Sequence, residues 1–61
     1  MKSEIKTEAH PHREGWTLTT WCEGRFWLYE ITGPKGASWG RGFYNAQEAR
    51  TRALQAISLT A

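Results

Sequence analysis

The stretch RFWLYEITGPKGASWGRGFYNAQEARTRAL, residues 25–54, decides the fold of this 61-residue chain. It begins with aromatic and β-branched side chains, which favour strands. Gly33, Pro34 and Gly36 then predict a turn, after which ASWGRGF returns as a second strand. Beyond Asn45 the alanines recur at helical spacing. The stretch therefore predicts two antiparallel strands followed by a helix.

The preceding segment, WTLTTWC, predicts a further strand, and Glu23 with Gly24 suits a two-residue hairpin loop. With that loop, Trp21 lies opposite Phe26, and the paired strands present two faces. One face carries Thr17, Thr19, Trp21, Phe26, Leu28 and Glu30, and the other carries Trp16, Leu18, Thr20, Trp27, Tyr29 and Ile31. Because the second set is more apolar, we expect it to face the core.

The last strand and the helix are expected to pack closely. Continued pairing puts Trp39 and Arg41 on the face of Leu28 and Glu30, and it puts Ser38, Gly40 and Gly42 on the core face. The helix begins with Asn45 and Glu48 at capping-box spacing. A stripe of mostly small side chains suits close approach to the glycine-rich strand, and it comprises Ala46, Ala49, Ala53, Ala56 and Ile57. The predicted fold is α+β, a three-stranded antiparallel β-sheet packed on one C-terminal α-helix.

Residues 1–14 are expected to be a flexible N-terminal tail, since they contain three basic and three acidic residues, two His and a Pro. Residues 15–61 then form a single domain. The chain has one cysteine and no run of 18 apolar residues, and its N-terminus is charged where a signal peptide is hydrophobic. We therefore expect a cytoplasmic protein that does not associate with a membrane.

Catalytic and metal-binding chemistry is not expected. No His outside the tail can serve as a base for Cys22, and Glu30 with Arg41 reads as a cross-strand charge pair. His10 and His12 lack the further ligands that a metal site needs. We expect neither an enzyme nor a bound cofactor or metal.

The face away from the helix carries more aromatic surface than a small monomer usually exposes to water, which predicts a partner-binding surface. Its candidate binding residues, of which Lys35 lies in the turn, are Trp21, Arg25, Phe26, Leu28, Glu30, Lys35, Trp39 and Arg41. The alternatives are that the N-terminal tail covers this face or that a second copy of the chain does so, in a homodimer.

Several features of the sequence from residue 24 onward occur together in one known type of domain. They are an aromatic before Glu30-Ile31, Pro34 and Gly36-Ala37 in the turn, Trp39 and Phe43 on the last strand, and the N-x-x-E-A helix start with Ala46, Ala49 and Ala56. In these features, which cover about half of the chain, the sequence resembles the Apetala-two/ethylene-response-factor type of DNA-binding domain and the related integrase arm-binding domains.

The resemblance implies a sheet face that enters the major groove of DNA, with arginines contacting bases and phosphates. It puts Glu30, Thr32 and Trp39 on the nucleic-acid side. The family's first strand supplies several arginines, whereas TLTTWCE has none, and the arginine of its last strand falls here near Ala37 or Ser38. Arg25, Lys35 and Arg41 remain to replace them.

Two functions follow from these observations. The first is a small nucleic-acid-binding module, with duplex DNA as the favoured ligand, of the kind found free-standing or in phages and other mobile elements. The net charge of +2 permits such a partner without requiring one. The alternative is a small phage- or plasmid-type inhibitor that docks its aromatic face on a host defence or nucleic-acid-processing complex, and the arginine-poor first strand favours it.

Overall fold

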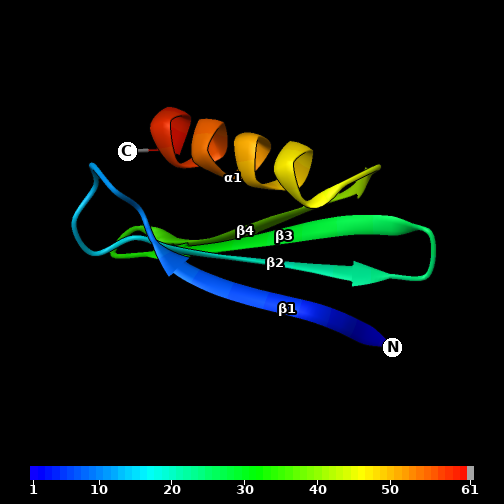
Figure 1. Cartoon of the computed structure of the whole chain (residues 1–61). Helices are drawn as coiled ribbons and strands as arrows, with labels where there is room; N and C mark the ends of the chain where they lie inside the picture. Colours follow the sequence, from blue (N-terminus) through cyan, green and yellow to red (C-terminus); the bar gives the residue numbers. More distant parts are fainter. Residues whose placement is uncertain (61) are drawn as a thin grey trace.

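A computed structural model describes residues 1–60 (Figure 1). These residues form β1 (Lys2–Ala9), β2 (Thr17–Glu23), β3 (Phe26–Gly33), β4 (Gly36–Phe43) and the helix α1 (Ala46–Thr60). The strands make one sheet in the order β1-β2-β3-β4, and every neighbouring pair is antiparallel. The helix lies across one face of the sheet. The predicted α+β class with a C-terminal helix is confirmed.

The prediction of three strands is wrong, because β1 adds a fourth within the segment that was expected to be a flexible tail. Its side chains lack an apolar alternation, so the sequence gives no strand signal there. Its pairing with β2 uses backbone hydrogen bonds and polar contacts instead. The hydroxyls of Thr7 and Thr19 lie 3.0 Å apart, and the Ser3 hydroxyl donates to the Cys22 carbonyl at 3.3 Å.

The predicted faces of the β2–β3 hairpin are confirmed, but its loop differs. The loop is Gly24-Arg25, so Trp21 lies opposite Leu28 and Glu23 opposite Phe26. Gly24 has a φ of 66°, which suits the glycine at the first loop position of a type II′ turn. This register is two residues away from the predicted one, and a shift of two leaves each side chain on its predicted face.

The core lies between α1 and the sheet face formed by the apolar set of β2 and β3. Its buried residues are Trp16, Leu18, Ile31, Ala53 and Ile57. In the predicted small stripe, Ala49, Ala53 and Ile57 are fully buried, whereas Ala46 is exposed. The helix starts as predicted, since the Glu48 backbone N–H donates to Asn45 Oδ1 at 2.7 Å.

Two glycines let aromatic rings lie directly on the backbone of the sheet. A Cβ on Gly33 would stand 2.2 Å from the Trp16 ring, and one on Gly40 would stand 2.5 Å from the Tyr29 ring. The space over Gly40, which was expected to receive the helix, is thus filled by Tyr29. The Tyr29 ring also stacks on Phe43, with ring centres 5.6 Å apart.

A methyl group at Gly33 should destabilise the protein, because the buried Trp16 ring must move to make room for it. We expect Gly33→Ala to lower the free energy of unfolding by about 1–3 kcal/mol in urea titrations. Ala37→Ser, at an exposed position of the neighbouring strand, is the control and should change it by less than about 0.5 kcal/mol. Equal stability of the two variants would contradict this packing.

Candidate functional site

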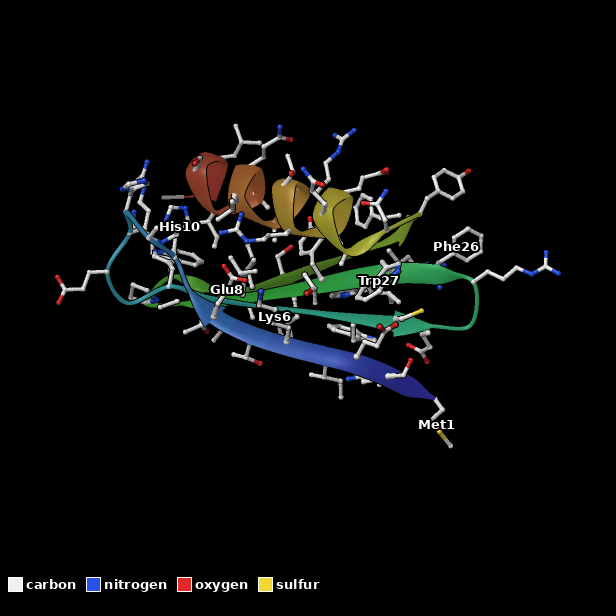
Figure 2. The ribbon with its side chains drawn as sticks, in the orientation of Figure 1. Met1, Lys6, Glu8, His10, Phe26 and Trp27 are labelled. Carbon is white, nitrogen blue, oxygen red and sulfur yellow. The ribbon has the colours of Figure 1, made fainter. Side chains whose placement is uncertain are left out.

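The sheet surface away from α1, called the open face below, gathers side chains from all strands of the sheet. The strand register assigns to it Lys2, Thr7, Ala9, Thr17, Thr19, Trp21, Glu23, Phe26, Leu28, Glu30, Thr32, Ala37, Trp39 and Arg41. Figure 2 shows the sheet with its side chains, with Met1 and Phe26 at the end near the β2–β3 loop. Of the predicted site, this face brings together the six residues that lie on strands.

Two neighbouring cross-strand rows form the centre of the open face. One row runs Trp21, Leu28, Arg41, and the next runs Thr19, Glu30, Trp39. Side chains directly opposite in such rows have Cβ atoms about 4.5–5.5 Å apart. The Arg41 guanidinium carbon lies 5.9 Å from the centre of the Trp39 ring, a cation–π contact. An aromatic surface and a cation are thus held side by side on a rigid sheet.

The aromatics of this face differ in their access to solvent. Trp39 is 61% exposed and Phe26 is 44% exposed, whereas Trp21 is only 7% exposed. The Lys2 ammonium stands 4.4 Å above the Trp21 ring, and the indole N–H of Trp21 donates to Glu23 Oε2 at 3.2 Å. The exposure expected of Trp21 is therefore not found, and the Lys2 side chain of the N-terminal strand lies over its ring.

An open groove of about 420 Å³ lies at the end of the face near the β2–β3 loop, lined by Glu23, Phe26, Leu28, Arg41 and Gly42. The β3–β4 register shifts at this point, and Gly42 has a φ of 93°, so the groove sits on a β-bulge. Bulges bend a strand and redirect neighbouring side chains.

Tyr44 is an exposed aromatic near this groove that was not among the predicted binding residues. Its side chain is 76% exposed, and its ring centre lies 6.2 Å from that of Phe26. Tyr44 follows the last paired residue of β4, so strand pairing alone did not assign it to either face. Extending the register through the Gly42 bulge would have placed it opposite Phe26.

The cations near the groove are free of carboxylate partners. Within residues 1–60, none of Lys2, Arg25 and Arg41 has an acidic group within ion-pair distance. Arg25 is exposed in the β2–β3 loop, and Lys35 is exposed in the turn at the other end of β3. Eight residues of β3 separate these turns, roughly 26 Å at 3.3 Å per residue. Lys35 therefore lies apart from the groove.

The expected charge pair between Glu30 and Arg41 does not form. Arg41 lies opposite Leu28 rather than Glu30, and its guanidinium stands over Trp39. In the described part of the chain, the Glu30 carboxylate has no ion pair or side-chain hydrogen bond. Both groups thus remain available to a ligand.

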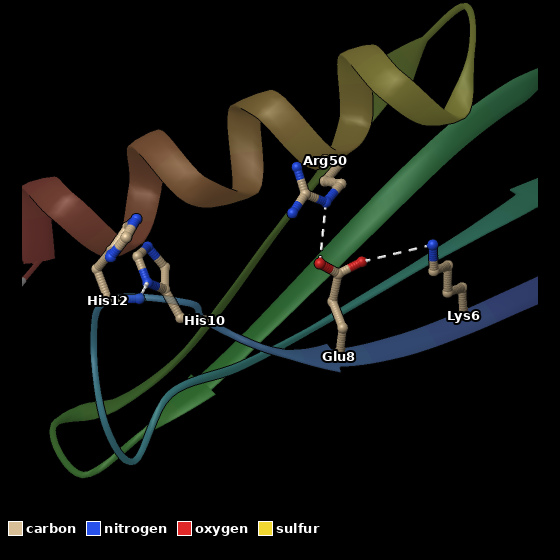
Figure 3. Close-up of polar contacts among 5 residues, drawn as sticks. All are labelled: Lys6, Glu8, His10, His12 and Arg50. Atoms are coloured by element: carbon tan, nitrogen blue, oxygen red, sulfur yellow. Dashed lines mark hydrogen bonds and ion pairs between the residues drawn. The ribbon is translucent and has the colours of Figure 1, made fainter.

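A second polar cluster ties the N-terminal segment to the helix (Figure 3). Arg50 Nε donates to Glu8 Oε1 at 2.9 Å, and Lys6 Nζ lies 3.9 Å from Glu8 Oε2. The backbone N–H of His12 donates to His10 Nδ1 at 3.0 Å. Among residues 1–60 there is no group of three or more His, Cys, Asp or Glu side chains placed to hold a metal ion.

Comparisons with protein-family models, with curated proteins and with solved structures find no match to this chain. Within residues 1–60, no helix has the length and apolar character required to cross a membrane.

His10 should make the stability of the protein depend on pH. Burial, followed by the charges of His12, Arg13 and Arg50, lowers the pKa of His10 from its usual 6.5. His10 therefore binds a proton more readily in the unfolded chain than in the folded one. The stability that neutral His10 contributes to the folded state is present above pH 6.5 and is lost as the pH falls through the lowered pKa. We expect the melting temperature to decrease between pH 7 and pH 5.

The matched variant is His10→Asn, whose side-chain oxygen can accept the same N–H without titrating. Its melting temperature should fall less over this pH range than that of the wild type. Parallel pH curves for the two proteins would contradict the role of His10.

Proposed function

We propose that this protein is a small, non-enzymatic nucleic-acid-binding module that uses the open face of its sheet. The observation that carries the proposal is the exposed Trp39 ring with the Arg41 guanidinium beside it. Bases of nucleic acids stack on exposed aromatic rings, and arginine meets phosphates or guanine edges. Phe26 offers a second ring at the groove, and Lys2 and Arg25 offer further positive charge.

The distribution of charge supports this proposal. The groove end of the open face has cations without carboxylate partners, whereas on the helix side Arg50 is already engaged by Glu8. The Glu23 carboxylate accepts the indole N–H of Trp21, which holds it at the edge of the groove. The resemblance to a family that binds DNA through the corresponding sheet face points to the same surface.

A protein-docking function is the second candidate, and the exposed Phe26–Tyr44 pair favours it. Tyr, Trp and Arg are the residue types that most often dominate the energetics of protein interfaces. In this alternative the groove would receive an apolar side chain of a host protein complex. A partner that survives nuclease treatment in a pull-down, and that is lost with Phe26→Ala, would identify this function.

Nucleic-acid binding is tested by fluorescence anisotropy of labelled oligonucleotides at low and physiological salt. Removing one stacked ring costs about 1–3 kcal/mol, so Trp39→Ala should weaken binding roughly 5- to 150-fold. Arg41→Gln should weaken binding. It should also reduce the magnitude of the slope of log K against log salt by the amount that corresponds to one lost phosphate contact, about one.

Arg52→Gln is the matched control, since it removes the same charge from an exposed position on α1. It should leave the affinity nearly unchanged, and circular dichroism should show all three variants folded. The absence of binding at low salt would contradict the proposal, as would equal losses in Arg41→Gln and Arg52→Gln.

A further inference from the structure

We infer that the open face takes unpaired bases of a single strand, and that Glu30 selects a base with an exocyclic amino group stacked on Trp39. This inference rests on the proposed function and names its ligand. It departs from the duplex DNA that the sequence favours. Three features of the sheet lead to it.

The first feature is the width of the sheet. Four strands leave three spacings of about 4.8 Å, so the axes of β1 and β4 lie roughly 14 Å apart before any side chain is counted. The major groove of B-form DNA is about 12 Å wide. A three-stranded sheet would be narrower by one spacing, and the additional strand β1 therefore hinders broadside entry into a duplex groove.

The second feature is the exposure of the Trp39 ring. In a duplex the bases are stacked on each other and offer only their edges to a protein. An unpaired base can leave the stack and lie on an aromatic ring, as in sheet proteins that bind single strands. Trp39 is 61% exposed, so its side chain is accessible to a base that has left the stack.

The third feature is the free carboxylate of Glu30, directly opposite Trp39 on the neighbouring strand. An ionised carboxylate only accepts hydrogen bonds, so it repels phosphates and attracts amino groups. Cytosine presents such an amino group at N4, and thymine has a carbonyl oxygen at the corresponding position. In a duplex one hydrogen of that amino group is paired and the other lies in the major groove, whereas in a single strand the whole pairing edge of the base is open to Glu30.

The scarcity of positive charge fits the same ligand. Within residues 1–60, the side-chain cations around the groove are Lys2, Arg25 and Arg41, which can provide three phosphate contacts. For a single strand, each neutralised phosphate contributes about −0.7 to the slope of log K against log salt. Three such contacts should therefore give a slope of about −2. Stacking on Trp39 and Phe26 must then supply much of the affinity.

The test measures the affinity of the full chain for three labelled ligands at pH 7.5. They are 12-nucleotide oligo-dC, 12-nucleotide oligo-dT and the oligo-dC·oligo-dG duplex of the same length. Oligo-dC should bind at least 10-fold more tightly than the duplex. Oligo-dC should also bind about 5- to 10-fold more tightly than oligo-dT. This factor is the lower part of the discrimination that a side chain achieves when it hydrogen-bonds to the edge of one base.

Glu30→Gln should remove the difference between oligo-dC and oligo-dT, because the amide both donates and accepts. Glu14→Gln is the control for the change in charge, at an exposed position in the loop between β1 and β2, and it should keep the difference. Circular dichroism checks that both variants fold.

The outcomes separate this inference from the proposed function. Duplex binding as tight as that of oligo-dC would overturn the inference and leave nucleic-acid binding standing. Equal affinity of the wild type for oligo-dC and oligo-dT would overturn the role of Glu30, as would an unchanged preference in Glu30→Gln. Failure of all three ligands to bind at low salt would overturn the proposed function as well.

Discussion

The pairing of β3 with both of its neighbours is the constraint on which the rest of the molecule depends. Ile31 of β3 is fully buried against the helix, while Glu30 beside it is exposed on the open face. A slip of one residue would exchange these two positions, and it would also move all remaining side chains of the strand to the opposite face of the sheet. The core and the candidate binding surface are therefore fixed by the same register. The Gly24 turn at one end and the short turn through Lys35 at the other hold that register.

The two faces divide the aromatic side chains between stability and recognition. On the helix side, the rings of Trp16 and Tyr29 lie against Gly33 and Gly40, and α1 presents small residues that allow close approach. A chain of this length buries little apolar surface, so large rings over glycine are an effective way to build its core. On the other side, Trp21 is covered by Lys2, which leaves Trp39 and Phe26 in contact with solvent. The aromatic surface that remains exposed lies beside Arg41.

Much of this arrangement could be predicted from the sequence, because period-two and helical patterns report which side chains are buried. These patterns predicted the faces of β2 and β3, the Asn45 cap, the buried alanines of α1 and the placement of Trp39 beside Arg41. They did not give β1, whose polar residues pair through the backbone and leave no periodic signal. The burial of Trp21 follows from β1 and was missed with it. Tyr44 was missed because the Gly42 bulge interrupts the simple alternation.

NMR can test directly whether Trp39 on the open face contacts nucleic acid. The chain has four tryptophans, so a ¹⁵N-labelled sample gives four indole N–H signals. On titration with oligo-dC, we expect large shifts of the signals from the Trp39 indole and from the amides of Glu30 and Arg41, whereas the signal of the buried Trp16 indole should hardly move. Shifts confined to the outer surface of α1 around Leu54 and Leu59, with Trp39 unchanged, would contradict this contact.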